Sequence, residues 1–334
     1  MSTTSGSVYH RDVTPPAPRR TVELVVPVLN EEGNLAALLD EVGRVFREKI
    51  PHVDWRVVFV DDGSRDRSWA LLTDLARRHP NVRALRLNHN YGAHLAISAG
   101  IQCTDADAAV VLAADMQDPP AVVAEFVRRW EEGFKVVWGV RTARRREAWH
   151  RKLFSRVFHR LVRRYALPTY PAQGTGSFCL IDRVVAQNLR RMHEDFRTIF
   201  GLVAMQGYAA AEVPYVREER TRGQSGWSVR RMIHTAIDVF TSYSHLPVRI
   251  ITWVGVISCA LAFLGIVYQV AIYSLYGSVR GWTMLFAAVC FFGGVQTLAL
   301  GILGEYIWRT FHEVKRRPLW FVEEATFDLE RTRP

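Results

Sequence analysis

The stretch from Val111 to Pro120, VLAADMQDPP, holds the residue types most suited to chemistry. An apolar run from Ala108 to Ala114 leads into three oxygen-bearing side chains, those of Asp115, Gln117 and Asp118. Carboxylate and amide oxygens suit Mg²⁺ or Mn²⁺, ions that commonly bridge a protein to substrate phosphates. An acidic loop that only caps the helix expected after the two prolines is the alternative. This stretch alone leaves both interpretations open.

The surrounding sequence predicts the elements that would position these side chains. Buried-strand patterns alternate with amphipathic helix patterns through the first 140 residues, which is typical of an α/β fold with a parallel sheet and helices on its faces. The expected strands are 22–28, 56–60, 82–87, 108–114 and 135–140. The expected helices are 35–46, one capped by Ser64 or Asp66 and ending at Ala76, one ending at Gly100, and one beginning at Ala121.

Polar loops follow four of the predicted strands. In a parallel sheet the carboxyl ends of the strands meet at one edge, where such folds bind ligands. Each residue could be a helix cap or a turn former, but four polar loops on one edge favour a ligand site. The residues are Asn30, Glu31, Asp61, Asp62, Asn90, Asp115 and Gln117.

The first of these loops excludes two common enzyme classes. Neither GxGxxG nor GxxxxGK[ST] follows the first strand. Because those glycine-rich loops cradle the phosphates in nicotinamide-dependent enzymes and P-loop ATPases, the sequence argues against both classes.

Composition narrows the environment and the partners. The chain has 334 residues and a formal net charge of +10, which suits a membrane surface, phosphorylated substrates or nucleic acid. Its four cysteines are scattered, so we expect a reducing compartment and no disulfide framework. Residues 1–20 are polar and proline-containing, which predicts a disordered tail rather than a secretory signal.

A basic amphipathic helix is expected at about 150–165. Phenylalanine, leucine and valine recur at helical spacing from Leu153 to Tyr165, and arginines lie opposite, including Arg156. This pattern describes a helix lying in a membrane interface. A surface helix packed on the core is the second interpretation, and nucleic-acid binding is the third, because no nucleic-acid fold motif is present.

Two long apolar segments predict a transmembrane hairpin. Between Arg249 and Arg309 the only formal charges are Arg280 and Glu305. The segments at about 250–274 and 282–306 each exceed the ~20 residues that span a bilayer. Basic residues flank the outer ends, so both termini are expected in the cytoplasm. An amphipathic helix at 229–247 would lead into the hairpin, and 311–334 would form a cytoplasmic tail.

Together these parts predict a transfer reaction at a membrane. A site for a metal and a diphosphate, a basic interfacial helix and clustered arginines suit a nucleotide-sugar donor and a lipid-phosphate acceptor. A divalent ion would neutralise the leaving nucleoside diphosphate. The acceptor phosphate is already largely anionic, since the second pKa of a phosphomonoester is ~6, so it needs positioning more than a strong base.

Five motifs in order resemble one known family. They are PVLNEE (27–32), VDDGSRD (60–66), NHNYG (88–92), ADMQDPP (114–120) and RTRGQSG (220–226). They closely resemble the polyprenyl-phosphate glycosyltransferases, relatives of dolichol-phosphate mannose synthase in glycosyltransferase family 2. The hairpin followed by RRPLWFVEE (316–324) resembles the bacterial branch with two membrane helices. The similarity extends over about residues 22–324.

The resemblance implies a GT-A fold, a Rossmann-like cytosolic domain spanning about 21–228, and inverting transfer to undecaprenyl phosphate in the cell membrane. A uridine donor is favoured over guanosine, and a tetramer is the expected assembly. Mg²⁺ or Mn²⁺ would bind Asp115 and Gln117. The donor would contact Pro27, Leu29, Asn30, Glu31, Asp61, Asp62, Gly63, Asn90 and Ala114. Candidates for catalysis and for phosphate or acceptor contact are Asp115, Arg141, Arg156, Arg220, Arg222 and Asp182.

The sequence departs from the family pattern at three places. Ala113 replaces the first aspartate of the metal motif, which predicts weaker metal binding. Ser177 and Cys179 replace an acid and a base, and Gly226 replaces a lysine often placed near phosphates. These departures keep open a degenerate transferase that serves as a membrane scaffold. A processive polysaccharide synthase is the other alternative, but its QxxRW motif is missing. The sugar and the glycan pathway are not readable from the sequence.

Overall fold

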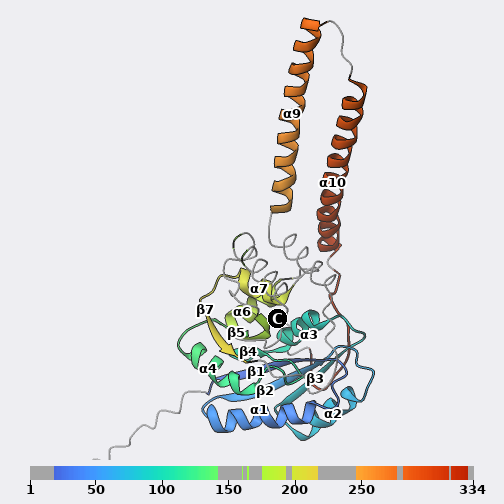
Figure 1. Ribbon diagram of the computed structural model, residues 1–334. Helices are drawn as coiled ribbons and strands as arrows, with labels where there is room; N and C mark the ends of the chain where they lie inside the picture. The colour runs from blue at the N-terminus through green and yellow to red at the C-terminus, as the bar shows by residue number, and fades with distance from the viewer. Residues whose placement is uncertain are drawn as a thin grey trace, which may run out of the picture.

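One eight-stranded mixed sheet forms the centre of the fold. The computed structural model describes residues 19–141, 160, 164, 175–192, 198–216, 246–276, 281–315 and 317–329. The strand order is β7-β5-β6-β4-β1-β2-β3-β8, and the sheet runs across the lower body of the molecule in Figure 1. The strands are β1 (Thr21–Val28), β2 (Asp54–Asp61), β3 (Val82–Leu87), β4 (Ala108–Val111), β5 (Val136–Arg141), β6 (Thr175–Asp182), β7 (Ala210–Tyr215) and β8 (Val322–Ala325).

Helices cover both faces of this sheet. The helices α1 (Leu35–Lys49), α2 (Ser68–Arg78) and α4 (Val123–Glu131), which follows the short 3-10 turn η1 (Pro120–Val122), pack on one face. The helices α3 (Ala93–Cys103), α6 (Arg183–Arg190) and α7 (Ile199–Met205) pack on the other (Figure 1). Because helices cover both faces, the inner strands are mainly apolar, as is typical of parallel sheets, although β1 carries the buried Glu23, which pairs with Arg83 of β3.

The alternation of side chains along each strand divides the interior into two cores. Leu24 and Phe59 face α1 and α2, whereas their neighbours Val25 and Val58 face α3. All four are at most 1% exposed. Their burial holds β4, β1, β2 and β3 parallel and in register, and this confirms the parallel arrangement predicted for the first four strands.

Two strands run antiparallel to their neighbours, which the sequence did not predict. The strand β6 pairs antiparallel with β4 and β5, and β8 pairs antiparallel with β3. Both follow long insertions in the chain, so neither belongs to the local strand–helix–strand alternation from which a parallel sheet was inferred. Since β8 belongs to the same sheet, part of the segment expected to be a separate tail at 311–334 is integrated into the α/β domain.

The expected helix caps at Ser64 and Asp66 are also corrected. The N-cap of α2 is Arg67, which makes no side-chain capping bond. Ser64 Oγ instead accepts a hydrogen bond from Asn30 N. Asp66 Oδ2 accepts one from Glu32 N at 3.2 Å, while its Oδ1 accepts one from Ser68 N at the first residue of α2. These polar groups therefore join loops to one another rather than only ending a helix.

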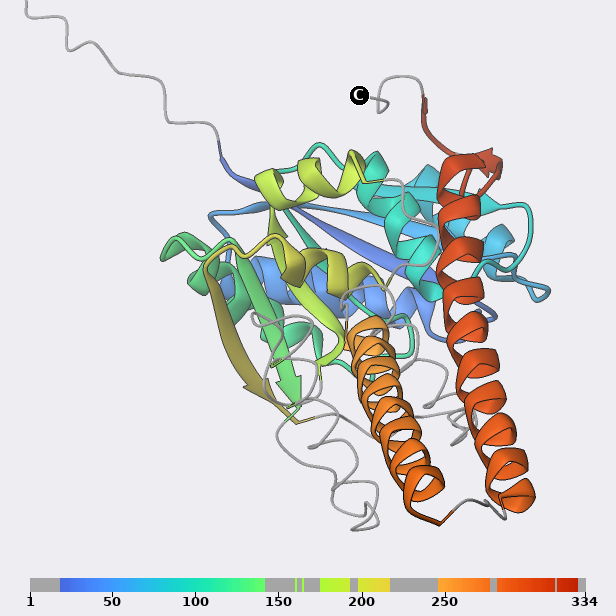
Figure 2. The same cartoon turned by 90° about the horizontal axis from the view of Figure 1, so that it is seen from above.

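Two long helices extend away from the α/β body. They are α9 (Leu246–Tyr276) and α10 (Trp282–Lys315), which contact each other and project side by side (Figures 1 and 2). Large apolar side chains such as Trp253, Phe263 and Leu298 are more than half exposed on them. Among the residues that the structure describes, one segment, Ile251–Leu275, is long and apolar enough to cross a membrane. The predicted basic helix at 150–165 and the helix at 229–247 lie almost wholly outside the described residues.

Close packing of α3 against the sheet depends on Gly100. A Cβ atom placed there would lie 2.4 Å from Val25 Cγ1 and 3.0 Å from Val60 Cγ2. We expect Gly100→Ala to destabilise the fold by about 1–3 kcal/mol through overpacking, measured as a lower melting temperature in detergent. The matched control is Gly43→Ala in α1, where the new methyl group would meet Trp55 at an ordinary 3.5 Å. Equal melting temperatures for the two variants would contradict the close approach of α3.

Candidate functional site

Four loops follow the carboxyl ends of β1, β2, β3 and β4, and they are called the first to the fourth loop in that order. In the sheet these strands are hydrogen-bonded neighbours in the order β4, β1, β2, β3. Adjacent strands lie about 4.8 Å apart, so the loops form a continuous row on one edge of the sheet. The structure thus brings together Asn30, Glu31, Asp61, Asp62, Asn90, Asp115 and Gln117, as the sequence predicted.

The first loop is bonded to the second through Asn30. Its φ of 55° lies in the left-handed region, which asparagine tolerates better than most residues. Asn30 N donates to Ser64 Oγ at 3.0 Å, and Asn30 Oδ1 accepts from Arg65 N at 2.8 Å. Glu31 N donates to Ser68 Oγ at 3.0 Å. The loop beyond β1 is therefore held rigidly against the start of α2.

Asp61 places a buried carboxylate at the end of β2. Its side chain is fully buried, and Oδ1 accepts a hydrogen bond from Ser64 N at 3.0 Å. Oδ2 lies 3.4 Å from Arg86 Nε, but no group in the described part of the chain donates a hydrogen bond to it. Desolvation raises the pKa of Asp61, although Ser64 and Arg86 oppose that effect. A buried acceptor of this kind is suited to a donor group on a ligand.

Asp62 holds the third loop. Its two carboxylate oxygens accept hydrogen bonds from Tyr91 N at 2.7 Å and Gly92 N at 2.8 Å. Burial raises the pKa of Asp62, and these two bonds oppose the rise. Gly63, at φ 73°, has no room for a side chain, because a Cβ would lie 2.7 Å from the backbone carbon of His89. The second and third loops therefore pack backbone to backbone.

The fourth loop carries the predicted metal ligands. Met116 has a φ of 55°, and this turn lets Asp115 Oδ1 accept a hydrogen bond from Gln117 N at 3.2 Å. Asp115 is partly buried and Gln117 is 8% exposed. Within the described ranges no group of three histidine, cysteine or acidic side chains could enclose a metal ion. A carboxylate and an amide oxygen nevertheless fit Mg²⁺ or Mn²⁺, which take one or two protein ligands together with substrate phosphates.

Tyr215 joins this loop to Arg141 and was not predicted. Its hydroxyl donates to Asp118 Oδ1 at 2.6 Å and accepts from Arg141 Nε at 3.3 Å. Desolvation and the neighbouring Asp118 raise the pKa of Tyr215 to about 12, so it stays protonated at neutral pH. The sequence signal was a tyrosine at the end of a strand, directly before the arginine-rich segment. Tyr215 therefore fixes the orientation of Arg141 at the same edge of the sheet as the predicted metal ligands.

Asp182 lies at the other end of the sheet, which corrects its expected role in orienting an acceptor. Because β6 is antiparallel, Asp182 pairs with Ala108 at the start of β4. Its Oδ2 accepts from Trp130 Nε1 at 2.8 Å and Lys135 Nζ at 3.0 Å, and Oδ1 accepts from Val184 N. Burial opposes the charge, but these hydrogen bonds outweigh it and lower the pKa of Asp182. Its role is structural.

The remaining predicted donor contacts line the same edge or its base. Pro27 is partly buried in β1, Leu29 is 41% exposed just beyond it, Asn90 is exposed, and Ala114 is buried. The predicted phosphate contacts at Arg156, Arg220 and Arg222 lie outside the described residues.

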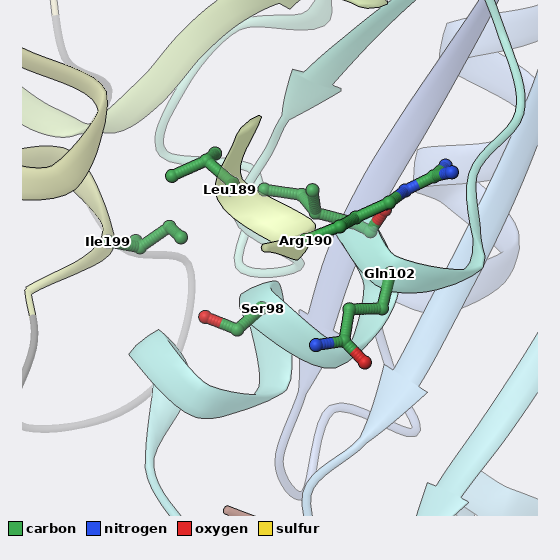
Figure 3. Close-up of a pocket in the computed structure, with 6 residues that line it drawn as sticks. Ser98, Gln102, Leu189, Arg190 and Ile199 are labelled. Carbon is green, nitrogen blue, oxygen red and sulfur yellow. The ribbon is translucent and has the colours of Figure 1, made fainter. Parts of the chain in front are cut away.

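A separate hollow between α3, α6 and α7 is shown in Figure 3. It is lined by Ser98, Ile101, Gln102, Leu189, Arg190 and Ile199. Arg190 Nε donates to the carbonyl of Ile101 at 3.3 Å, so the arginine ties α6 to α3. Since α3 ends near the start of β4, this hollow lies away from the four loops and adds nothing to their chemistry.

Comparison with known proteins identifies one family model, two relatives and one solved structure that resemble this chain. The family model described as "Glycosyl transferase family 2" matches residues 23–190. The uncharacterized glycosyltransferase YkcC of Bacillus subtilis is 33% identical over 93% of this chain and 95% of that protein. A bactoprenol glucosyl transferase of Shigella flexneri, derived from a prophage, is 30% identical over 91% of this chain and 98% of that protein. Among solved structures, a mannosyltransferase from Pyrobaculum calidifontis in complex with GDP-Man and Mn²⁺ covers 92% of this chain and 91% of that one, at TM-score 0.48 and 19% identity.

The position of Asp182 predicts that its substitution lowers the stability of the fold without weakening nucleotide binding. Asp182→Asn would place an amide N–H₂ against Trp130 and Lys135, or lose one of their hydrogen bonds. We expect a loss of about 1–3 kcal/mol of stability at neutral pH, measured by thermal unfolding in detergent, with nucleotide binding unchanged.

The pH dependence of that loss has a defined sign. Because the pKa of Asp182 is lowered by folding, its stabilisation is present above the ordinary aspartate pKa of ~3.9 and disappears as the pH falls through the lower folded value. The comparison variant is Asp62→Asn, which we expect to weaken nucleotide binding by loosening the third loop. Loss of nucleotide binding in Asp182→Asn would restore Asp182 to the site.

Proposed function

Because this chain belongs to glycosyltransferase family 2, we propose that it transfers a sugar from a nucleoside diphosphate donor to polyprenyl phosphate at the cytoplasmic face of a membrane. The observation that supports the nucleotide donor is the buried carboxylate of Asp61, whose Oδ2 lies beside Arg86 but accepts no hydrogen bond in the described part of the chain. Similarity to a bactoprenol glucosyl transferase over 91% of the chain supports the acceptor half.

Asp61 Oδ2, which accepts no hydrogen bond from the described residues, supports a uridine donor over a guanosine donor. Uracil presents one N–H on its pairing edge, whereas guanine presents donors on two adjacent nitrogens. The one carboxylate oxygen at the end of β2 that lacks a hydrogen bond from a described residue matches one N–H and would leave a guanine donor unsatisfied, which costs roughly 1–3 kcal/mol. The backbone of Gly63 and Asn90 beside it would bring the ribose and phosphates toward Asp115.

Asp115 and Gln117 would hold Mg²⁺ or Mn²⁺ together with oxygens of the diphosphate. When bound, the ion supplies positive charge that stabilises the departing nucleoside diphosphate. Arg141 lies at the end of β5 with its Nε committed to Tyr215. Its remaining N–H groups would then bind an anionic phosphate oxygen in a fixed orientation.

The transfer itself is an in-line displacement with inversion. An oxygen of the acceptor phosphate forms a bond to the anomeric carbon while the bond to the diphosphate oxygen breaks, and the electron pair leaves with the nucleoside diphosphate. No proton has to be removed, because a phosphomonoester with a second pKa of ~6 is already anionic at neutral pH. The residues of this chain therefore contribute mainly by holding the two substrates together.

The helices α9 and α10 would anchor the enzyme where its lipid acceptor resides. The segment Ile251–Leu275 meets the length and apolarity of a membrane span, and α10 runs beside α9 (Figure 1). We propose a hairpin with both ends cytoplasmic, since Arg280 is the only charge at its turn and basic residues flank its outer ends. The helices would keep the acceptor phosphate close to the loop edge. A homotetramer remains part of this proposal.

A donor screen tests the function directly. Purified protein in detergent is incubated with undecaprenyl phosphate, Mn²⁺ or Mg²⁺ and a panel of UDP- and GDP-sugars, and the lipid fraction is analysed by mass spectrometry. We expect a new lipid-monophosphate sugar with one UDP-sugar. Nucleotide binding without turnover across the whole panel would instead favour a scaffold.

Asp115→Ala tests the metal ligand. We expect transfer to fall by at least about a hundredfold, because a bound metal contributes several kcal/mol of transition-state stabilisation, while the melting temperature stays unchanged. The matched control is Asp74→Ala, which removes an exposed carboxylate paired with Arg78 on α2. Full activity in Asp115→Ala would rule out the metal role.

A further inference from the structure

The segment that follows α10 returns to the α/β domain and covers the second and third loops. Residues 317–327, here called the strap, include β8, which pairs with β3 at the sheet edge. Thr326 ties its far end to the same strand, because Thr326 Oγ1 accepts from Ala84 N at 2.9 Å. The strap is therefore part of the folded domain, and six residues, 316–321, separate α10 from β8.

One set of contacts runs from the strap to Asp61. Arg86, on β3, lies 3.4 Å from Asp61 Oδ2, 3.3 Å from Glu323 and 3.8 Å from Glu324. Trp69 helps to hold this group, since its Nε1 donates to Glu324 Oε2 at 3.1 Å and the Arg86 guanidinium lies 5.8 Å from its ring centre. The guanidinium is shared between a fully buried carboxylate and two half-exposed ones. Its position beside Asp61 thus depends on the strap.

A second set runs from the strap to the loop held by Asp62. Phe321 N donates to the Tyr91 hydroxyl at 3.2 Å, and the carbonyl of Phe321 accepts from Asn88 N at 3.1 Å. The Tyr91 hydroxyl in turn donates to Asn88 Oδ1 at 2.8 Å. Tyr91 N is one of the two donors to Asp62. Both aspartates at the end of β2 are thus supported from the strap, by two independent routes.

We propose that Arg86 and Tyr91 are positioning residues for the nucleotide of the donor, and that the strap acts through them to shape the nucleotide-binding edge. The inference rests on the proposed function, in which Asp61 and Asp62 contact the donor. Neither residue is assigned a contact with the reacting atoms. Arg86 keeps the Asp61 carboxylate charged and oriented, and Tyr91 keeps the third loop closed against Gly63.

Linkage requires this coupling to act in both directions. If the strap favours the binding-competent arrangement of the loops, bound nucleotide must stabilise the docked strap by the same factor. A residue that only stabilises the fold would not connect nucleotide binding to strap opening. Hydrogen exchange of the strap amides therefore distinguishes a positioning role from a structural one.

The experiment measures UDP binding and strap exchange in the full chain. Binding of UDP with Mn²⁺ is followed by calorimetry in detergent for wild type, Arg86→Met, Arg86→Lys and Tyr91→Phe. We expect at least about tenfold weaker binding in Arg86→Met, partial recovery in Arg86→Lys, and about fivefold weaker binding in Tyr91→Phe, the factor that one hydrogen bond is worth. UDP should slow exchange of amides 321–326 in wild type, and this protection should shrink in the variants.

Two matched controls remove equivalent groups elsewhere. Tyr208→Phe removes a hydroxyl just before β7 that accepts a hydrogen bond from Asn188 Nδ2. Arg78→Met removes an exposed ion pair with Asp74 on α2. Both should bind UDP as wild type does. Because Tyr91→Phe keeps the ring and both bonds to Asp62, it tests the proposal even where Arg86→Met fails to fold.

Three results would count against the proposal. Wild-type affinity in Tyr91→Phe together with either Arg86 variant would overturn it, and so would strap exchange that is unaffected by UDP. Binding of neither UDP nor GDP by the wild type would overturn it together with the donor assignment. Failure of transfer to polyprenyl phosphate, with the shifts in UDP binding present, would reject the acceptor and leave this inference standing, because no lipid enters the measurement.

Discussion

The burial of two adjacent carboxylates at the end of β2 is the constraint on which the candidate site depends. Asp61 and Asp62 lose solvation on folding, and the surrounding loops must supply donors in return. Ser64 N, Tyr91 N and Gly92 N do so, and the loop of β3 is thereby held against the end of β2. Ser64 also accepts a hydrogen bond from Asn30 N and so joins the loop of β1 to the same group. Both carboxylate oxygens of Asp62 accept a hydrogen bond, whereas only one oxygen of Asp61 does so in the described part of the chain. The packing of the second loop against the third therefore follows from the hydrogen-bonding needs of these two carboxylates, and Asp61 Oδ2 is left without a hydrogen-bond donor in the described part of the chain.

The sequence alone predicted those parts of the fold that depend on neighbouring residues in the chain. The strands and helices up to residue 141 could be predicted from the spacing of apolar residues and from the turn-forming residues between them. Each buried strand is a short, mainly apolar run, and each connection between strands carries one helix. The convergence of Asn30, Asp61, Asn90 and Asp115 then follows from parallel topology alone. Similarity to a family adds the chemistry, because position at a strand end identifies a ligand edge without identifying the ligand.

Long-range pairing could not be obtained in the same way. The local pattern of the segment 175–182 does not say whether it runs parallel or antiparallel to β4. Its antiparallel direction places Asp182 at the opposite end of the sheet from the predicted site. The roles of Tyr215 and Arg86 depend on partners 97 and more than 200 residues away, respectively. Such contacts leave no periodic trace in the sequence, so a tyrosine or an arginine within a strand reads as an ordinary strand residue.

The place of β8 in the sheet has a consequence for the biosynthesis of the enzyme. Translation completes β1 to β7 before α9 and α10, and β8 only after them. Until then β3 is an open edge strand, whose unpaired backbone groups invite association with other chains. A polypeptide that stalls before β8 is made therefore keeps an exposed edge and an unsupported Arg86. Exposed strand edges favour aggregation, so pairing of β8 with β3 removes this hazard only after both long helices have been made.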